Sequence, residues 1–223
     1  MNSDLTTDRL VLRRFTDSDR DHLASLHNDP EVMCYLTGGN PMSREQIERA
    51  YHEVFAREGY CVAIERGIGA FLGWFAFHRT ADRDPAQREP GYRLRRSALG
   101  KGYATEGALA RNERGFSDVE VQRVRAQTIV VNLPSRQVME QADLTMDYVF
   151  HLNRDDPLPS TEEGEVEYGM DRASWQRCHP GPRKPSMIHL ISYSRPRSRR
   201  NSELGTINTR PVSLLAECHA TRS

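Results

Sequence analysis

One short run, Gly100-Lys101-Gly102-Tyr103-Ala104-Thr105-Glu106, constrains the fold more than any other segment of this 223-residue chain. It lies between a segment typical of a β-strand and one typical of an α-helix, and its two glycines allow a tight turn and close approach to a ligand. The first N–H groups of the following helix have no partner within the helix and lie at the positive end of its dipole. The run therefore predicts a strand–turn–helix unit with an anion site suited to a pyrophosphate.

A plain turn remains the alternative for this run, because a Gly-x-Gly turn before a helix is common. The run lacks the GxxxxGK[ST] pattern of a P-loop, and it lacks the third glycine of the dinucleotide-binding fingerprint. A second motif, Asn132-Leu133-Pro134-Ser135-Arg136, follows the most strand-like segment and opens a helix. Asn132 has an amide for hydrogen bonds to a ligand and Ser135 a hydroxyl, although simple capping of the helix by Asn132 is the alternative.

The body of the chain alternates segments typical of strands and of helices. Ser43 and Gln46 fit a capping box at the start of a helix. Strands are expected over 9–14, 60–65, 70–78, 91–96, 123–131, 144–152 and 165–170, and helices over 17–28, 43–58, the segment after Gly102, 134–141 and 171–175. The order predicts a mixed α/β sheet in one domain over residues 1–177.

Composition excludes several classes of protein. No run approaches the ~20 apolar residues of a membrane helix, and the first ten residues lack the apolar stretch of a secretory signal. The cysteines at 34, 61, 178 and 218 form no CxxC pair and have no chelate spacing. We therefore expect a cytoplasmic protein with reduced thiols, no disulfide framework and no metal.

Residues 178–223 differ from the body in composition. From His179 onward there are eight Lys/Arg and two Asp/Glu residues, and five of the twelve prolines. We expect a disordered basic tail, because this segment has too little apolar surface to offset its ordering entropy. The segment 194–200, SRPRSRR, could contact nucleic acid, and a solvated extension without a function is the alternative.

The two motifs, with three further blocks, resemble the GNAT acetyltransferase superfamily in its RimJ/RimL-like branch. That branch typically shows RLxLRxF near the start, then DPEVMxYL-like, ElGYxLxxxxxGxGYATEA and RVxAxTxxxNxxSxxVMEKxGF stretches. The matching residues here are Arg9-Leu10-Val11-Leu12-Arg13-Arg14-Phe15, Asp29-Pro30-Glu31-Val32-Met33, Glu89-Pro90-Gly91-Tyr92-Arg93-Leu94, the glycine run, and Arg123-Val124-Arg125-Ala126-Gln127-Thr128 with Asn132, Ser135, Arg136, Val138, Met139 and Glu140. The resemblance covers about residues 5–177. It implies the GNAT fold: a central mixed, mostly antiparallel sheet with two splayed parallel strands, flanked by helices.

The resemblance also implies acetyl-CoA as co-substrate and acetyl transfer to a primary amine by direct attack in a ternary complex. The acceptor would be a protein N-terminal α-amine or a small molecule. Acetyl-CoA is expected in the wedge between strands 91–96 and 123–131. The residues expected to contact it are Leu94, Arg95 and Arg96 through their backbone, then Gly100, Lys101, Gly102, Tyr103, Ala104 and Thr105 at the pyrophosphate, and Asn132, Ser135 and Arg136 at the next helix.

Two residues are expected to be catalytic: Glu89 as the general base and Ser135 as the group that steadies or protonates the leaving thiolate. A charge at an exposed strand edge is the alternative for Glu89. An attacking amine must be neutral, so an α-amino group with a pKa of ~7.7–8 is favoured over a lysine at ~10.4. The reserve candidates for the base are Glu167 and His151, while cleft hydrogen bonds or core packing remain open for Tyr92 and Tyr148.

Several residues depart from the pattern of the family, among them Leu99, where tryptophan is common, and Ser97, at the Arg/Gln position of the phosphate motif. Pro90 removes one N–H from a strand, which matters if that group pairs across the sheet. Asp143 and Glu120 replace common turn glycines, and the position of Asp143 is often left-handed. Each of these two glycine replacements is expected to cost on the order of 1 kcal/mol of stability.

Two further questions stay open at the level of the sequence. A non-catalytic CoA-binding module, whose basic tail contacts nucleic acid or a ribosome, is the alternative to an enzyme. It predicts CoA binding without acetyl transfer. A monomer and a homodimer are both compatible with the sequence, and no membrane partner is expected.

Overall fold

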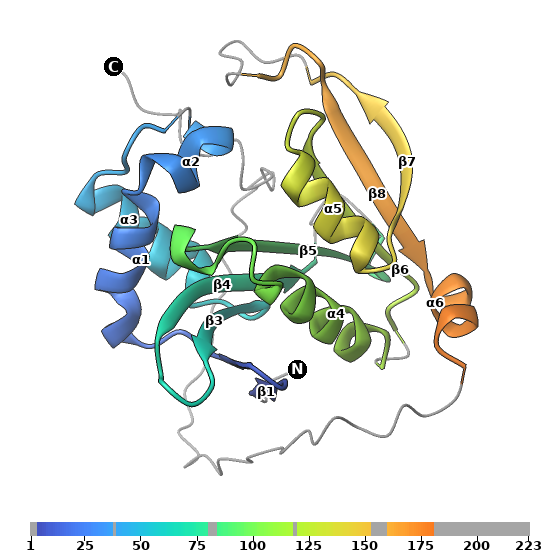
Figure 1. Cartoon of the computed structure of the whole chain (residues 1–223), viewed down its shortest axis with the longest axis horizontal. Coiled ribbons are helices and arrows are strands. Elements are labelled where there is room, and N and C mark those ends of the chain that lie inside the picture. The colour runs from blue at the N-terminus through green and yellow to red at the C-terminus, as the bar shows by residue number, and fades with distance from the viewer. Residues whose placement is uncertain (1–3, 38, 80–83, 118–119, 153–159, 181–223) are drawn as a thin grey trace, which may run out of the picture.

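The computed structural model describes residues 4–37, 39–79, 84–117, 120–152 and 160–180, so the predicted tail lies almost entirely outside the described residues. Figure 1 shows the arrangement of the elements. The strands are β1 (Leu5–Thr6), β2 (Leu10–Arg13), β3 (Tyr60–Glu65), β4 (Phe71–His78), β5 (Gln87–Leu94), β6 (Arg123–Ile129), β7 (Thr145–Phe150) and β8 (Glu165–Asp171). The α-helices are α1 (Arg20–His27), α2 (Pro30–Thr37), α3 (Arg44–Ala50), α4 (Tyr103–Phe116), α5 (Leu133–Gln141) and α6 (Arg172–Cys178).

The eight strands form one sheet in the order β1-β2-β3-β4-β5-β6-β8-β7. Every neighbouring pair is antiparallel except β5 and β6, which are parallel. The expected mixed, mostly antiparallel sheet with one parallel pair is therefore confirmed. The parallel pair divides the sheet into a half around β4 and a half around β8.

The helices cover opposite faces of the sheet. Side chains alternate between the faces along a strand, so Trp74 and Ala76 on β4 face one side while Phe75 and Phe77 face the other. Trp74 and Ala76 pack with Leu23 and Leu26 of α1 and with residues of α3. Phe77 packs with Phe116 of α4, which lies beside α5. Figure 1 shows α1–α3 grouped beside β3–β5, and α4 and α5 crossing the front of the sheet.

Several helix boundaries follow from local chemistry. The predicted capping box is confirmed: the Ser43 hydroxyl accepts from the Gln46 N–H at 3.2 Å, and the Gln46 side chain accepts from the Ser43 N–H at 2.7 Å. This helix becomes a π-helical turn over Tyr51–Phe55 rather than continuing as α-helix to residue 58. Helix α2 was not predicted, although Asp29 accepts from the Glu31 N–H at 3.0 Å and Pro30 occupies the first turn.

The predicted boundaries of β5 were wrong at both ends. The strand begins at Gln87 rather than at residue 91, and it ends at Leu94 because Arg96–Ala98 form a 3₁₀ turn. Pro90 lies within the strand, where it pairs with Phe77. Proline is uncommon inside strands, so its presence argued against a strand at this position. At the other end of the domain, α6 is capped by Asp171 as predicted but runs to Cys178.

Asp143 has the left-handed backbone conformation expected at that position, with φ = 66°. In the part of the chain that the structure describes, Cys34, Cys61 and Cys178 are free thiols, and no group of three His, Cys, Asp or Glu residues is arranged to hold a metal ion. None of the helices described is both long and apolar enough to cross a membrane.

Candidate active site

The parallel strands β5 and β6 separate after two paired positions. Their ladder contains only Gln87 opposite Arg123 and Arg88 opposite Val124. Beyond that point β5 continues along β4 as far as Leu94, and β6 continues along β8 to Ile129. The sheet is thus open between the two strands while each strand stays held by its outer neighbour.

Pro90 lies just past the end of this ladder and weakens any further pairing with β6. The Ala86 carbonyl accepts from the Gln122 N–H at 2.8 Å, so the backbone of Ala86 faces β6. Backbone groups alternate in direction along a strand, and Pro90 therefore also faces β6. Because proline has no N–H to donate, the next hydrogen bond from β5 to β6 after Arg88 cannot form. The N–H group that Pro90 removes is one on the β6 side, and the pairing with β4 continues through Phe77 opposite Pro90.

The same alternation fixes which backbone groups face the gap. The Arg95 N–H donates to the Leu72 carbonyl at 2.7 Å, and the Arg95 carbonyl accepts from the Ala98 N–H at 2.9 Å. The N–H and C=O of Leu94 consequently point away from β4, toward the gap. Arg96 has already entered the 3₁₀ turn, and its side chain forms an ion pair with Glu31 at 2.6 Å. Of the three backbone positions expected to contact acetyl-CoA, Leu94 is the one that faces the gap.

The predicted glycine turn leads from this gap into α4. Gly100 and Gly102 have φ values of 69° and 79°, a conformation that glycine adopts without strain. Gly102 is the N-cap and has no side chain that could accept from the first helical N–H groups. The N–H groups of Tyr103, Ala104 and Thr105 thus lie free of intrahelical bonds at the positive end of α4. Lys101 is exposed beside them.

The start of α5 lies across the gap from β5. Asn132 caps this helix, since its Oδ1 accepts from the Ser135 N–H at 3.3 Å and its Nδ2 donates to Thr128 at 3.1 Å. Asn132 therefore caps α5, and its contact with acetyl-CoA stays a prediction. Burial raises the pKa of the Tyr92 hydroxyl, and a hydrogen bond with the Ser135 side chain opposes that rise. Ser135 is thereby placed against a residue of β5.

Arg136 turns away from the gap. Its Nε donates to the Tyr168 hydroxyl at 3.1 Å and its Nη1 to the Val130 carbonyl at 3.1 Å. The Tyr168 hydroxyl in turn donates to Glu140 at 2.8 Å. The described contacts of Arg136 therefore join α5 to β8, which the sequence did not indicate.

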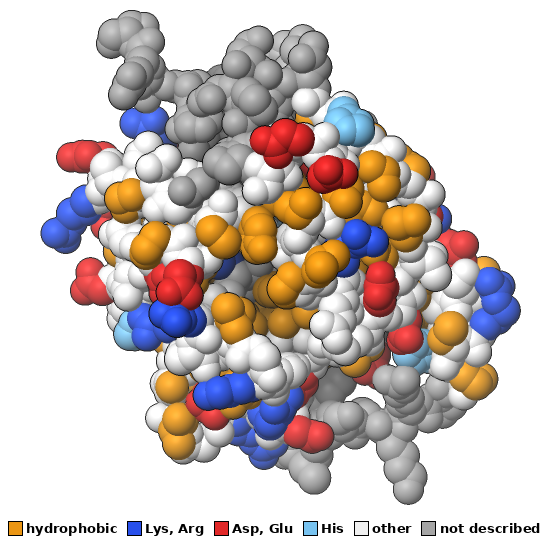
Figure 2. Space-filling view, turned by 45° about the horizontal axis from the view of Figure 1, so that its top comes forward, with side chains coloured by type: hydrophobic (Ala, Val, Ile, Leu, Met, Phe, Trp, Pro, Cys, Tyr) orange, Lys and Arg blue, Asp and Glu red, His pale blue; other side chains and the backbone are white. Residues whose placement is uncertain are grey.

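Glu89 and Ser135 lie on opposite sides of the sheet. Glu89 is opposite His78 on β4 and shares the α1–α3 face with Trp74, whereas Tyr92, the neighbour of Ser135, points to the α4–α5 face. The two residues thus flank the place where the backbones of β5 and β6 separate. Figure 2 shows hydrophobic side chains gathered around a hollow in the middle of the molecule, between the α1–α3 part and the α5–β8 part.

The reserve candidate Glu167 is fully buried and already engaged. Its carboxylate forms an ion pair with Arg125 and accepts from Gln127 at 2.7 Å. Arg125 also donates to the Tyr148 hydroxyl at 3.2 Å. All of these residues lie on the face of the second half-sheet that Glu89 shares. The other reserve candidate, His151, is exposed just after β7.

A buried pair fixes β5 to α1. Arg93 donates from Nη1 to His27 Nε2 at 2.9 Å, and His27 Nδ1 lies 3.1 Å from the Met42 sulfur. Accepting from Arg93 requires the imidazole proton on Nδ1, so the ring is neutral. Burial lowers the pKa of His27 well below its usual value, and the charge of Arg93 lowers it further. Sequence analysis missed this pair, because its members are 66 residues apart.

Comparison with known proteins agrees with this architecture. The model of the acetyltransferase (GNAT) domain matches residues 9–145. FsC-acetyl coenzyme A-N(2)-transacetylase of Aspergillus fumigatus is 30% identical over 193 residues, which cover 82% of this chain and 80% of that protein. The chain therefore belongs to the GNAT acetyltransferase family. It is an N-acetyltransferase that uses acetyl-CoA.

Solved structures share the fold at lower identity. A GNAT-family acetyltransferase from Bacillus anthracis superposes with a TM-score of 0.65 at 22% identity, covering 76% of this chain and 99% of that one. Aminoglycoside acetyltransferase AAC(6')-Ib in complex with coenzyme A gives a TM-score of 0.61 at 20% identity, covering 75% and 98%. At these identities the likeness supports the fold alone.

Proposed function

We propose that acetyl-CoA occupies the gap between β5 and β6, with its pyrophosphate on the N–H groups at the start of α4. The observation that carries this proposal is the end of the β5–β6 ladder at Arg88 together with the glycine turn beside it. The backbone groups of Leu94 would bind the pantetheine amides as a further strand would. Gly100 through Thr105 would receive the phosphates, and Lys101 would add a mobile positive charge.

In the proposed acetyl transfer, Glu89 acts from one side of the gap and Ser135 from the other. The acceptor amine approaches from the face of Glu89 and its nitrogen attacks the thioester carbonyl carbon. Glu89 accepts the proton that the amine loses, directly or through one water. The carbon–sulfur bond breaks, and Ser135, backed by the Tyr92 hydroxyl, donates a hydrogen bond or a proton to the thiolate sulfur. Holding the two reactants together supplies much of the rate, on the order of 7–11 kcal/mol.

We propose a primary amine of a small molecule as the acceptor. The relative from Aspergillus fumigatus is named for transfer to an N(2) position of FsC, and AAC(6')-Ib is named an aminoglycoside acetyltransferase. Glu89 lies on the face from which the acceptor would come, and a carboxylate there favours an approaching ammonium group. A protein N-terminal α-amine, as expected from the RimJ/RimL-like motifs, is the second candidate.

No finding favours the non-catalytic alternative, in which the chain binds CoA without transfer. It is distinguished by CoA binding without turnover, and most of the basic tail that it invokes, residues 181–223, lies outside the described residues. The division into an acetyltransferase domain over 1–177 and a separate tail stays a prediction, as do the cytoplasmic location and the monomeric or homodimeric state.

The experiment is a transfer assay that follows release of the CoA thiol with a panel of small primary amines and with N-terminal peptides. We expect turnover with small amines, and a fall of about 10²-fold in kcat for Glu89→Gln, the usual contribution of a general base. Glu113→Gln removes a carboxylate near the C-terminal end of α4, the opposite end of that helix from the proposed pyrophosphate site, and is the matched control. Turnover with peptides but not with small amines would show that the acceptor is a protein N-terminal amine instead. Binding of acetyl-CoA without transfer to any amine would contradict the proposal.

A further inference from the structure

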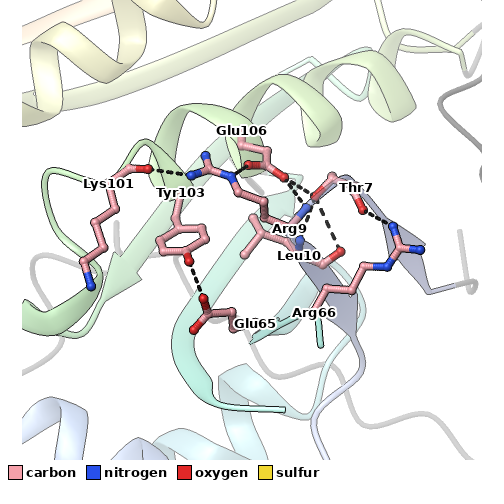
Figure 3. A network of polar contacts seen from close by, with 8 residues as sticks. All are labelled: Thr7, Arg9, Leu10, Glu65, Arg66, Lys101, Tyr103 and Glu106. Atoms are coloured by element: carbon pink, nitrogen blue, oxygen red, sulfur yellow. Dashed lines mark hydrogen bonds and ion pairs between the residues drawn. The ribbon is translucent and has the colours of Figure 1, made fainter. Parts of the chain in front are cut away.

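A network of polar contacts behind the glycine turn joins the N-terminal strand to the start of α4 (Figure 3). Glu106, in the first turn of α4, accepts from the Thr7 hydroxyl at 2.5 Å, from the Arg9 backbone N–H at 2.9 Å and from Arg9 Nε at 2.6 Å. The Tyr103 hydroxyl donates to Glu65 at 2.5 Å. The network thus connects residues about a hundred positions apart in the chain.

Arg9 is the residue that holds the turn on both sides of Gly102. Its Nε binds Glu106, which follows Gly102, and its Nη1 donates to the carbonyl of Lys101, which precedes it, at 2.8 Å. Its guanidinium lies 4.6 Å from the centroid of the Tyr103 ring. A Cβ on Gly102 would lie only 3.2 Å from Arg9 Nη2, so the side chain fits closely against the turn. The planar guanidinium of arginine has N–H donors in fixed directions, so it suits this double contact better than the ammonium group of lysine does.

The network also removes an electrostatic conflict at the start of α4. Glu106 is a negative charge one turn from the N–H groups that would receive a pyrophosphate. Burial would raise the pKa of Glu106, but hydrogen bonds from Thr7 and Arg9 outweigh burial and hold its pKa below the usual range. The carboxylate is therefore ionised at neutral pH, and Arg9 directs and neutralises it. Without Arg9, Glu106 would oppose an anion at the same helix end.

We propose that Arg9 is a positioning residue for acetyl-CoA, which fixes the shape of the turn and neutralises Glu106 without touching the reacting atoms. This inference rests on the proposed position of the pyrophosphate at Gly100 through Thr105. Loss of Arg9 leaves the turn to be ordered by the ligand, and ordering a binding loop weakens affinity rather than chemistry.

The test is calorimetric titration of acetyl-CoA into the full chain and its variants, with thermal unfolding to check the fold. For Arg9→Ala we expect the Kd to rise about tenfold. Arg9→Lys keeps the positive charge but loses the several N–H donors of the guanidinium, so its Kd should rise about threefold. The matched control is Arg66→Ala, which removes an arginine that donates to the Thr7 carbonyl at 3.2 Å but does not touch the turn. Its Kd should stay within twofold of the wild type.

A second ligand separates a role at the phosphates from a general loosening of the site. S-acetylpantetheine lacks the pyrophosphate, and its affinity can be measured by displacement of acetyl-CoA. We expect Arg9→Ala to leave that affinity within twofold of the wild type. An equal loss for both ligands would overturn the inference, because it would indicate that the whole gap is disturbed.

Gly102→Glu separates failure of the inference from failure of the proposed site. If Gly102→Glu abolishes binding while Arg9→Ala binds as the wild type does, the pyrophosphate site stands and the role of Arg9 is wrong. If Gly102→Glu binds acetyl-CoA normally, the proposed site itself is wrong and the role of Arg9 falls with it. Should Arg9→Ala fail to fold, Arg9→Lys carries the same comparison.

Discussion

At the scale of single residues, Asp143 shows strain that the sequence anticipated. It follows α5 with φ = 66°, where a side chain is disfavoured, and its contact with His179 is 3.4 Å long and partly exposed. The Asp143 side chain is 41% exposed, so solvent screens this long contact and it contributes little. The backbone conformation therefore decides the effect of substitution at this position.

We predict that Asp143→Gly stabilises the protein by about 0.5–1 kcal/mol, because glycine adopts positive φ at no steric cost. Thermal unfolding should show a midpoint higher by about 1–4 °C. Asp143→Ala removes the same carboxylate but keeps a Cβ, and it should lower the midpoint. If glycine lowers the midpoint as alanine does, the pair with His179 outweighs the backbone strain.

His27 should make stability depend on pH in a defined direction. The folded state keeps the imidazole neutral, because burial and Arg93 lower its pKa well below the usual value. In the unfolded chain histidine takes up a proton near pH 6.5. The unfolded state then binds more protons than the folded state below about pH 6.5, so the free energy of unfolding falls as the pH falls through that value.

The measurement is urea unfolding at pH 7.5 and pH 5.5 for the wild type and for His27→Gln, which can still accept from Arg93 but does not titrate. We expect the wild type to lose about 1 kcal/mol more than the variant between these two pH values. Equal losses would show that protonation of His27 does not limit stability in this range.

At the scale of elements, α4 packs so closely on β4 that two of its residues must be small. A Cβ on Gly107 would overlap the ring of Phe75, and one on Gly115 would overlap the ring of Phe77. Phe75 is buried, with 1% of its surface exposed, so its ring has little room to move. This close packing sets the distance between α4 and the sheet, and with it the position of the start of α4 beside the gap.

We predict that Gly107→Ala destabilises the protein by about 1–3 kcal/mol through overpacking. Helix propensity alone would give the opposite sign, since alanine is favoured over glycine by about 1 kcal/mol within a helix. Urea unfolding measures the change. Adding Phe75→Leu should recover part of the loss, and a stabilising Gly107→Ala would contradict the packing seen here.

The sequence predicted elements well where local chemistry alone decides them. The Ser43–Gln46 capping box, the glycine turn and the β3–β4 hairpin are formed as expected, because each depends on neighbouring residues. The start of β5 was missed because Pro90 disfavours a strand locally, whereas the long pairing with β4 holds the strand in place. The family motifs placed β5 and α5 beside one gap, yet gave no sign of the Arg9–Glu106 and Arg93–His27 contacts, which only the folded chain brings together.

At the scale of the whole molecule, the strands of the two half-sheets pair, within the residues that the structure describes, at the two positions of the β5–β6 ladder. The half around β4 is held by α1 through Arg93 and His27, and the half around β8 is held by α5 through Arg136 and Tyr168. Each half therefore has a helix contact of its own that holds its side of the gap, and Phe77 of β4 packs in the core of the second half. The Thr105 hydroxyl donates to Gln141 at 2.7 Å and joins α4 to α5 beside the opening. This arrangement supports a gap that is formed before the ligand binds.

The most direct test of the central proposal is a crystal structure of the protein with CoA. We expect phosphate oxygens within about 2.7–3.2 Å of the amide nitrogens at the start of α4, and a pantetheine amide bonded to the backbone of Leu94. CoA bound outside the β5–β6 gap, with the α4 N–H groups bonded to water, would contradict it.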